Sequence, residues 1–321
     1  MSTQQFVYLI FGIVLALALV FDLGIISKKN KEVSIKNAFW QTIFWVVLAM
    51  SFFVFMWVEK GSKPALEYLS AYLMEWSLSI DNIFVFILIF NSFKVKEKNY
   101  SRVLLIGILM AIVFRIIFIT VGVALVAQFH WILYGFGLFL LYTGYKMFTT
   151  NDDDNFEPHE TKVYLLLKKY LPLASHDGNG KFMVKENGKP IYTTLFVVVI
   201  LLASIDLVFA LDSIPAVMGI SKDKLVIYTS NIFAVLGLRS LFFLLRGAVN
   251  KFDFLQQGIA IVLIFIGAKM LGEYYIDQWI DKTLQTVLSL LVILICISGS
   301  IWYSIYFDKK GKIDALPEEK N

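Results

Sequence analysis

Long apolar runs dominate this sequence and constrain its fold more than any other feature. Helices of roughly 17 to 25 apolar residues can cross the hydrocarbon core of a bilayer. Nine runs of about that length occur, at 6–26, 38–58, 69–90, 102–128, 131–148, 193–216, 225–246, 255–272 and 283–306. Hydrophobic residues make up 58% and charged residues 17% of the 321 positions, so lipid must solvate most of this surface. We therefore predict an all-α membrane protein with about nine transmembrane helices in a single transmembrane domain.

The positions of lysine and arginine predict how these spans are oriented. The loops after the first, third, fifth and seventh spans, together with the C-terminal tail, hold 20 of the 29 basic residues. The N-terminus and the other loops hold 5, and the remaining four lie inside spans. Basic residues accumulate on the cytoplasmic side of membrane proteins. We therefore expect the N-terminus outside the cell and the C-terminus in the cytoplasm.

The longest stretch outside the predicted spans is 149–192, which falls on the predicted cytoplasmic side. It contains an amphipathic stretch at 163–171 and two strand-like stretches, 181–185 and 190–193. Asn187-Gly188 lies between the two strands and is a strong signal for a hairpin turn. We predict a small cytoplasmic loop that contains a β-hairpin.

Two blocks of the sequence share a series of polar residues set in apolar runs. Each block begins with an acid, five further residues, an aspartate, a small polar residue and an isoleucine. An arginine lies in the middle of the next span, and a Gly-x-Lys-Met motif lies in the span after that. The matching residues are Glu75, Asp81, Asn82, Arg115, Gly144 and Lys146 in spans three to five, and Asp206, Asp212, Ser213, Arg239, Gly267 and Lys269 in spans six to eight.

A block of three helices ends on the opposite side of the membrane from where it began, so the second block must be inverted. A rival register matches Ser79-Ile-Asp81 with Ser204-Ile-Asp206 and also gives inverted repeats. Inverted repeats with a site near the membrane midplane are typical of secondary transporters. We therefore predict two inverted three-helix repeats, spans 3–5 and spans 6–8.

Four carboxylates lie well inside the predicted spans, and they are Glu75, Asp81, Asp206 and Asp212. A charged side chain at the bilayer centre costs several kcal/mol, so each acid needs a partner, water or an ion. Structural pairing with Arg115 and Arg239 satisfies two of the four acids at best. We therefore favour a cation pathway over a purely structural role for these residues.

Helix geometry limits how these acids can share an ion. Six residues rise about 9 Å along a helix, so one straight helix cannot give both of its acids to one ion. If the antiparallel spans three and six cross near their centres, the acids meet in two levels, Glu75 with Asp212 and Asp81 with Asp206. Alternatively, span six unwinds at Pro215, which cannot donate a helical hydrogen bond, and the two levels merge into one site.

The available donors indicate which ion would bind. Carboxylates, Asn82, Ser213 and backbone oxygens are hard donors that suit Mg²⁺, Ca²⁺ or Mn²⁺ rather than copper or zinc. The single cysteine, Cys296, and the three histidines lie away from the motifs. Monovalent cations or protons remain open at this point, because carboxylate relays also serve them.

Basic residues inside the spans are candidates to neutralise these acids. They are Arg115 and Arg239 in mid-span, and Lys146 and Lys269 near helix ends. The neighbouring glycines, Gly144 and Gly267, are expected to let helices approach closely. Asp22, near the cytoplasmic end of the first span, is a candidate for the mouth of the path.

No catalytic signature accompanies these features. The sequence has no nucleophile–base pair, phosphate-binding loop or zinc motif, and 149–192 is too small for a catalytic domain. We therefore expect neither an enzyme nor a prosthetic group. A different class stays open, namely a membrane assembly or scaffold protein that helps to metalate or insert partner proteins and uses these charges structurally.

The motifs resemble those of the TerC family, and within it the Alx-type manganese exporters of the LysE superfamily. The resemblance covers nearly the whole chain and rests on the runs 75–82, 131–147, 209–216, 229–239 and 265–270. It implies export of Mn²⁺ from the cytoplasm across a bacterial cytoplasmic (inner) membrane. It further implies that the acids of spans three and six bind the ion, with protons as candidate counter-ions.

One position departs from the pattern of this family. The family usually has a glutamate three residues before the first aspartate of span six, where this sequence has Ala203. One carboxylate fewer at that place would lower the affinity for the ion, change the ion preference or alter proton coupling.

Overall fold

The computed structural model describes residues 3–21, 33–129, 131–149, 157–186, 188–246 and 254–314. Helices occupy all nine predicted spans within these residues. They are α1 (Thr3–Phe21), α2 (Ile35–Lys60), α3 (Ser62–Ser92), α4 (Glu97–Gln128), α5 (Ile132–Thr149), α7 (Thr194–Ile220), α8 (Lys224–Leu236), α9 (Leu238–Leu245), α10 (Leu255–Trp279) and α11 (Lys282–Asp314). The segment between α5 and α7 holds η2 (Pro158–Glu160), α6 (Lys162–Tyr170), η3 (Gly178–Gly180), β1 (Met183–Glu186) and β2 (Lys189–Tyr192).

Most of the long helices have the length and composition of membrane spans. Among the described residues, α2, α3, α4, α7, α10 and α11 are long and apolar enough to cross a bilayer. The pair α8 and α9 makes a seventh such unit, which bends by 40° at Gly237. The shorter helices α1 and α5 lie at the first and fifth predicted spans. The prediction of an all-α membrane protein is confirmed, whereas the number of nine spans stays a prediction.

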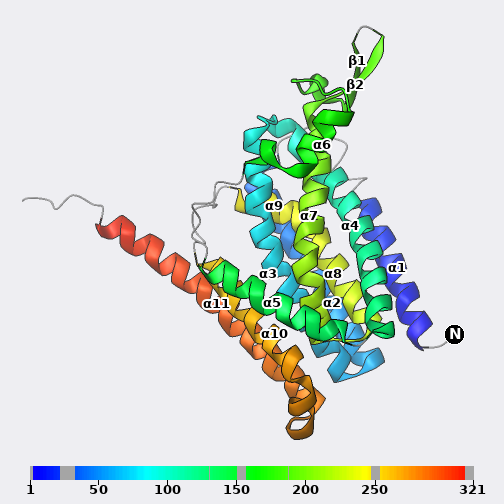
Figure 1. Ribbon diagram of the computed structural model, residues 1–321, viewed down its shortest axis with the longest axis vertical. Coiled ribbons are helices and arrows are strands. Elements are labelled where there is room, and N and C mark those ends of the chain that lie inside the picture. The colour runs from blue at the N-terminus through cyan, green and yellow to red at the C-terminus, as the bar shows by residue number, and fades with distance from the viewer. Residues whose placement is uncertain are drawn as a thin grey trace, which may run out of the picture.

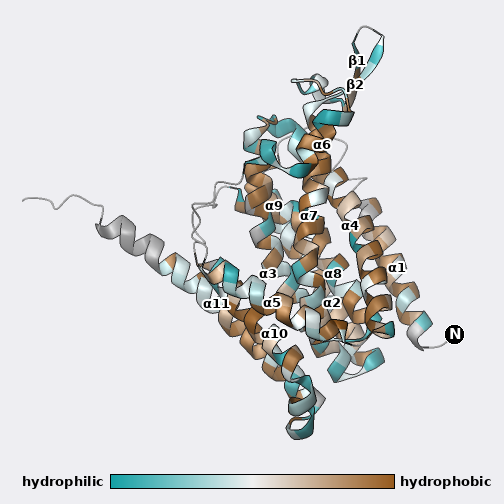
Figure 2. Ribbon diagram, in the orientation of Figure 1, coloured by the Kyte–Doolittle hydropathy of each residue, from teal (hydrophilic) through white to brown (hydrophobic). Residues whose placement is uncertain are grey.

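The helices form a bundle around α3 (Figure 1). α3, α4 and α7 run along the long axis of the molecule, and α5, α10 and α11 slant across one side. In its most apolar stretch α3 is 75% buried, whereas α2 and α11 are each 28% buried and turn their apolar side chains outward. Hydrophilic residues gather at the two ends of the bundle (Figure 2). The hairpin lies at one end, and the α10–α11 junction lies at the other.

α5 and α10 cross closely through the glycines of the two Gly-x-Lys-Met motifs. A Cβ at Gly144 would lie 2.8 Å from the carbonyl oxygen of Ala260, and a Cβ at Gly267 would lie 2.7 Å from that of Gly137. The glycines therefore allow the close approach that the sequence predicts. Gly144 thus faces Ala260, seven residues before Gly267, and Gly267 faces Gly137, seven residues before Gly144. A two-fold relation between the helices would give this reciprocity, and the inverted repeat itself stays a prediction.

The segment between α5 and α7 contains the β-hairpin where the Asn-Gly signal predicts one. β1 and β2 pair antiparallel, with Met183 opposite Tyr192 and Glu186 opposite Lys189. Gly188 has φ of +79°, which the turn requires and which glycine adopts without strain. The location of this segment in the cytoplasm stays a prediction.

Ionic and aromatic contacts dock this segment on the corner between α3 and α4. The Lys96 ammonium lies 3.0 Å from a carboxylate oxygen of Asp177. Arg102 Nη1 donates to the carbonyl oxygen of Gly180 over 2.9 Å, and its guanidinium lies 4.7 Å from the ring centroid of Phe182. The segment therefore links the hairpin end of α4 to the start of α7.

Candidate functional site

A cluster of buried polar residues lies inside the bundle. We call Glu75, Arg115, Asp206 and Asn231 the central cluster, and they come from α3, α4, α7 and α8. Each of them exposes at most 1% of its surface. Arg115 Nε and Nη2 donate to the two carboxylate oxygens of Asp206 over 2.8 Å and 3.0 Å, and Nη1 donates to Glu75 Oε2 over 2.7 Å. One guanidinium thus binds two carboxylates on two other helices, one of them in the strong bidentate geometry.

Asn231 fixes the orientation of this guanidinium. Arg115 Nη1 also donates to Asn231 Oδ1, over 3.1 Å. The amide nitrogen of Asn231 donates to the carbonyl oxygen of Ile227 over 2.9 Å, so the amide oxygen faces Arg115. The two carboxyl groups of the central cluster therefore share one guanidinium.

Several polar atoms on the same helices are buried without a hydrogen-bond partner in the described part of the chain. They are Oε1 of Glu75 and the hydroxyls of Ser77, Ser79 and Ser213. Glu75 and Ser79 are four residues apart on α3 and therefore share a face of the helix. Buried polar groups are almost always hydrogen-bonded, so an ion or water molecules would complete the bonding of these atoms.

The acids of α3 and α7 meet at a different level from the predicted one. We expected Glu75 to lie with Asp212 and Asp81 with Asp206, but Arg115 joins Glu75 to Asp206. The pairing of Glu75 with Asp212 is therefore wrong, whereas the pairing of Asp81 with Asp206 stays a prediction, because the side chain of Asp81 is not described. Six residues rise about 9 Å, so Asp212 lies about that far from the cluster, on the side away from the hairpin.

α7 stays helical through Pro215, which the structure places inside an unbroken helix from Thr194 to Ile220. The alternative prediction, local unwinding at Pro215, is therefore wrong. Proline removes one helical hydrogen bond. Pro215 and the residues around it are buried against neighbouring helices, and this packing holds the backbone in the helical path.

Asp212 faces α5 rather than the central cluster. Thr143 Oγ1 donates to Asp212 Oδ1 over 3.2 Å, and the carboxylate is half-buried. The auxiliary donors proposed from sequence, Asn82 and Ser213, are both buried, with 2% and 1% of their surface exposed. Neither makes a described contact with the central cluster.

The four basic residues singled out from sequence have different surroundings. Arg115 is the one that the structure places between two of the acids. Arg239 is buried on α9, Lys146 is exposed near the end of α5, and Lys269 Nζ donates to Ser289 Oγ on α11 over 3.1 Å. For these three residues, neutralisation of the central acids stays a prediction.

On the hairpin side of Asp206 the space between the helices is closed. Phe86, Leu104, Leu202 and Leu238 are among the residues that line a gap beside Asp206, and this gap has no room for a water molecule. Ala203, at the place where the resemblance implies a glutamate, is fully buried on the same helix. In this conformation the central cluster has no open path toward the hairpin end through that gap.

Two predicted site residues lie wholly or partly outside the described residues. Asp22 follows Phe21, where the description of α1 ends, and the backbone of Asp81 belongs to α3 but its side chain is not described. Among the side chains that are described, no group of three or more His, Cys, Asp or Glu residues is arranged to hold a metal ion. A shared site for the four acids therefore stays a prediction.

Sequence reasoning missed Asn231 and Thr143. A signal for Asn231 was present, because Thr229-Ser-Asn231 places three polar residues in a row inside an apolar span. Thr143 gave no comparable signal. A single threonine in a membrane helix can bond to its own backbone, so its presence predicts no partner.

Comparisons with known proteins agree with these features. The model of the integral membrane protein TerC family matches residues 60–312. An uncharacterized membrane protein of Rickettsia felis is 40% identical over 294 residues, which is 92% of this chain and 97% of that one. An uncharacterized membrane protein of Myxococcus xanthus is 40% identical over 274 residues, or 85% of each chain. A Salmonella typhi protein, Alx, whose name marks it as a candidate membrane-bound redox modulator, is 37% identical over 309 residues, 94% of this chain and 95% of that one. No solved structure matches the chain.

Proposed function

Because the chain belongs to the TerC family of integral membrane proteins, we propose that it is a secondary transporter that exports Mn²⁺ from the cytoplasm by alternating access. The central cluster is the observation that carries this proposal. Two carboxylates from α3 and α7 are held inside apolar helices by one guanidinium, and one oxygen of Glu75 has no described partner. Ionisable groups inside a membrane protein mark ion pathways more often than they serve packing.

The donors around the cluster suit a hard divalent cation. Carboxylate, amide and hydroxyl oxygens are the ligands that Mn²⁺, Mg²⁺ and Ca²⁺ prefer. Glu75 Oε1 and the hydroxyl of Ser79 lie on one face of α3 with no described partner. Mn²⁺ itself, rather than Mg²⁺ or Ca²⁺, rests on the family resemblance.

Arg115 acts in this proposal as a tethered cation that occupies the acids between passages of the ion. An entering divalent cation must displace the guanidinium from Glu75 and Asp206, and the guanidinium returns when the ion leaves. The two carboxylates are therefore never left together without a positive charge, which the apolar surroundings would penalise heavily.

The position of the cluster suits alternating access. Glu75 and Arg115 come from the first predicted repeat, and Asp206 and Asn231 come from the second. Rocking of one repeat against the other would therefore change the distances within the site itself. The closed gap beside Asp206 fits a conformation that is shut toward the hairpin end.

Protons are the proposed counter-ion. Carboxylates that release a divalent cation can take up protons in its place, so one set of side chains would serve both directions of exchange. The flux of Mn²⁺ through reconstituted protein should then rise when a pH gradient is imposed in the favourable direction. An Mn²⁺ flux that does not change with the pH gradient would rule out proton exchange and leave the proposal of Mn²⁺ transport standing.

The second candidate function is a membrane assembly or scaffold protein. The observation in its favour is that Arg115 already satisfies two of the buried acids, as a purely structural ion pair would. The redox role in the name of the Salmonella relative has less support here, because the chain has one cysteine and cannot form an internal dithiol. A protein that co-purifies stoichiometrically with a partner and binds no divalent cation would favour the scaffold.

Flux measurements on purified protein in liposomes test the transport proposal. Mn²⁺, Mg²⁺, Ca²⁺ and Fe²⁺ are compared, and each is measured with and without a pH gradient. We expect Asp206→Asn, Asp81→Ala and Asp212→Ala to reduce Mn²⁺ flux to the level of empty liposomes. Glu59→Gln, an exposed carboxylate near the end of α2, is the control and should keep the wild-type rate. Wild-type flux in Asp81→Ala and Asp212→Ala would refute the proposal.

A further inference from the structure

The short helix α6 lies at the hairpin end of the bundle and leaves much of its surface uncovered (Figure 1). None of its residues is fully buried. Val163, Tyr164 and Leu167 are partly buried and pack against the bundle. Three other large apolar side chains are more than half exposed, and they are Leu165 (53%), Leu166 (54%) and Tyr170 (70%).

Two lysines lie on the same side of α6 as two of these exposed apolar residues. Leu166 and Tyr170 follow Lys162 by four and eight residues, and Lys169 follows it by seven. Residues at this spacing share one face of a helix. The Lys169 ammonium lies 5.3 Å from the ring centroid of Tyr170. We call these four residues the α6 stripe, which combines apolar surface with two positive charges.

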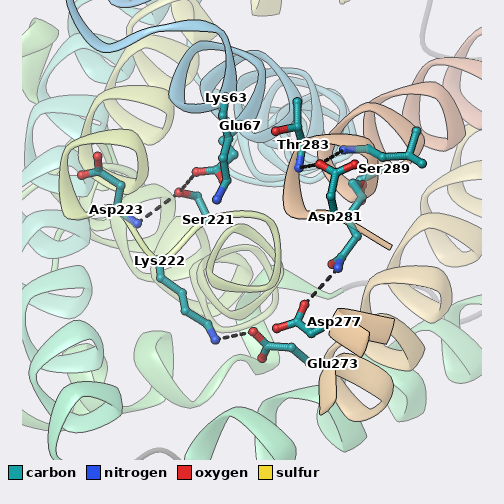
Figure 3. A network of polar contacts seen from close by, with 12 residues as sticks. Lys63, Glu67, Ser221, Lys222, Asp223, Glu273, Asp277, Asp281, Thr283 and Ser289 are labelled. Carbon is teal, nitrogen blue, oxygen red and sulfur yellow. Dashed lines mark hydrogen bonds and ion pairs between the residues drawn. The ribbon is translucent and has the colours of Figure 1, made fainter. Parts of the chain in front are cut away.

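The lysines of α6 differ from those at the opposite end of the bundle. There, Lys222 forms an ion pair with Glu273, and the Lys63 ammonium lies 3.9 Å from a carboxylate oxygen of Glu67 (Figure 3). α6 carries three lysines and no acid. In the described part of the chain, no carboxylate lies within ion-pair distance of any of the three. The positive charge of α6 is therefore available to a negatively charged partner.

The lengths of two central helices indicate where the bilayer surface lies. α3 has 31 residues and α7 has 27, which gives lengths of about 46 Å and 40 Å. The hydrocarbon core and the headgroup layers of a bilayer together measure about 40–45 Å. The ends of α3 and α7 at the hairpin end therefore lie among the lipid headgroups.

Contacts at both ends of α6 hold it at this same level. The ring centroid of Tyr164 lies 5.6 Å from that of Phe93, which directly follows the last residue of α3. Just after α6, the carbonyl oxygen of Pro172 accepts from the backbone N–H of Tyr192 over 2.9 Å, two residues before α7 begins. α6 is thus fixed beside the end of α3 and the start of α7, at the depth of the headgroups.

We propose that α6 is an interfacial helix that binds the surface of a bilayer containing anionic phospholipid. Leu166 and Tyr170 enter the boundary between headgroups and acyl chains, and Lys162 and Lys169 bind the lipid phosphates. Amphipathic helices bind membranes through buried apolar area and through attraction between lysine and anionic lipid. Tyrosine is common at this depth, because its ring is apolar and its hydroxyl is polar. The proposal does not depend on the transport function.

A lipid surface is the occupant that the position of the stripe requires. Leu166 and Tyr170 lie three residues after Val163 and Leu167, so the stripe borders the face of α6 that packs against the bundle. Whatever covers the stripe must therefore lie beside the bundle at the depth of the headgroups. Lipid fills that space around a membrane protein, and anionic headgroups complement the two lysines.

The depth of spin labels in the bilayer tests this orientation. Full-length protein with Cys296→Ser, which removes its one cysteine, carries a label at Leu166→Cys or at Lys168→Cys in vesicles of equal parts phosphatidylcholine and phosphatidylglycerol. Electron paramagnetic resonance compares collisions with oxygen, which concentrates in lipid, and with a water-soluble nickel chelate. Two residues are about 200° apart around a helix. We expect the label at Leu166→Cys to meet mainly oxygen and the label at Lys168→Cys to meet mainly the chelate.

Hydrogen exchange of the α6 amides tests the requirement for anionic lipid. Exchange in wild-type protein should be slower in the mixed vesicles than in pure phosphatidylcholine. Each lysine near an anionic surface strengthens binding roughly fivefold, so Lys162→Gln with Lys169→Gln should reduce this difference by up to about 25-fold. Lys162→Arg with Lys169→Arg keeps the charge and should keep the difference, which separates loss of charge from damage to packing.

Lys185→Gln with Lys189→Gln is the matched control, because it removes the same charge from exposed positions of the hairpin. This variant should keep the wild-type difference between the two lipids. Labels that both report water, or exchange that is equal in the two lipids, would overturn the proposal. A label at Leu166→Cys that is in water at low protein density and immobilised at high density would assign the stripe to a second copy of the chain, and would also overturn it.

Discussion

Glu75 and Asp206 belong to helices that are far apart in the sequence, and a single guanidinium holds their carboxylates together. Arg115 donates over 2.7 Å to Glu75 and over 2.8 Å and 3.0 Å to Asp206. A cation that enters this site must therefore break three hydrogen bonds before it binds two carboxylates. The strength of the arginine contacts, as much as the number of acids, sets the affinity of the proposed site.

Removal of Arg115 is the most direct test of this relationship. Arg115→Ala leaves two carboxylates buried without their counter-charge, and loss of one partner from a buried ion pair costs roughly 3–5 kcal/mol. We expect a correspondingly large drop in the thermal unfolding temperature of the purified protein in detergent. Arg115→Lys should fall between wild type and Arg115→Ala, because it keeps the charge and loses the bidentate geometry.

A triple variant supplies the control for this measurement. Glu75→Gln and Asp206→Asn added to Arg115→Ala remove the charges that were left unpaired. Much of the lost stability should then return, although the cavity of the missing side chain remains. A triple variant no more stable than Arg115→Ala would show that packing, and not charge, explains the loss.

The ion pair between Lys96 and Asp177 should make docking of the 157–192 segment depend on pH. The nearby Lys96 ammonium lowers the pKa of the Asp177 carboxyl below its ordinary value. An acid with a lowered pKa stabilises the docked form above its ordinary pKa of about 3.9, and this contribution is lost as the pH falls through the lowered value. Lys96 is largely exposed, so the effect is small, about 0–1 kcal/mol.

Hydrogen exchange of the peptides within 157–186 measures this effect, after correction for the intrinsic rate at each pH. Protection should fall as the pH drops below about 4, and Asp177→Asn should show the low protection already at neutral pH. High salt should reduce the difference between wild type and Asp177→Asn, since it screens exposed charges. Equal protection in the two proteins at neutral pH would contradict this role for the ion pair.

Close packing between α5 and α10 gives a prediction that does not involve charge. Gly267→Ala places a methyl group 2.7 Å from the carbonyl oxygen of Gly137, so the helices must move apart. Such overpacking costs about 1–3 kcal/mol. Thermal unfolding in detergent should show Gly267→Ala to be clearly less stable than wild type.

Gly135→Ala, on α5, is the matched control. A Cβ at Gly135 meets nothing within 4 Å, and alanine favours a helix by up to about 1 kcal/mol over glycine. This variant should therefore be as stable as wild type or slightly more stable. A loss of stability equal to that of Gly267→Ala would show that substitution of any glycine in these helices is harmful.

Local sequence patterns predicted the elements of this fold well. Apolar runs are long and continuous in a membrane protein, and wherever the structure describes the nine runs they coincide with helix. The hairpin followed from Asn187-Gly188, because a two-residue turn with positive φ has few other sequences. Gly144 and Gly267 were predicted to permit close packing, and the α5–α10 crossing depends on them.

The arrangement of the site was less predictable, because it depends on where helices cross. The sequence placed Glu75, Asp81, Asp206 and Asp212 on α3 and α7, but the level of the crossing is set by packing along the whole length of both helices. A shift of six residues along one helix moves a partner by about 9 Å, which exchanges Asp212 for Asp206 opposite Glu75. The prediction that α7 unwinds at Pro215 failed for a related reason, because packing against neighbouring helices keeps α7 helical.

Replacement of Asn231 should lower the stability of the protein and raise its apparent affinity for Mn²⁺. Asn231→Leu has a similar shape and removes the acceptor for Arg115 Nη1. Hydrogen bonds to charged groups contribute about 1.5–3 kcal/mol, so stability should fall by that order. The guanidinium is also held less firmly against Glu75 and Asp206, so Mn²⁺ displaces it more easily. The KM for Mn²⁺ flux should therefore fall, without a rise in the maximal rate.

Thr229→Val on the same helix is the control, because the Thr229 hydroxyl donates to the carbonyl oxygen of Leu225 in its own helix and does not contact the central cluster. Liposome flux and thermal unfolding should be measured on both variants. We expect Thr229→Val to lower stability slightly and to leave the KM unchanged. If Asn231→Leu also leaves the KM unchanged while it lowers stability, Asn231 supports the fold alone, and the hold of Arg115 on the acids does not set the affinity for the ion.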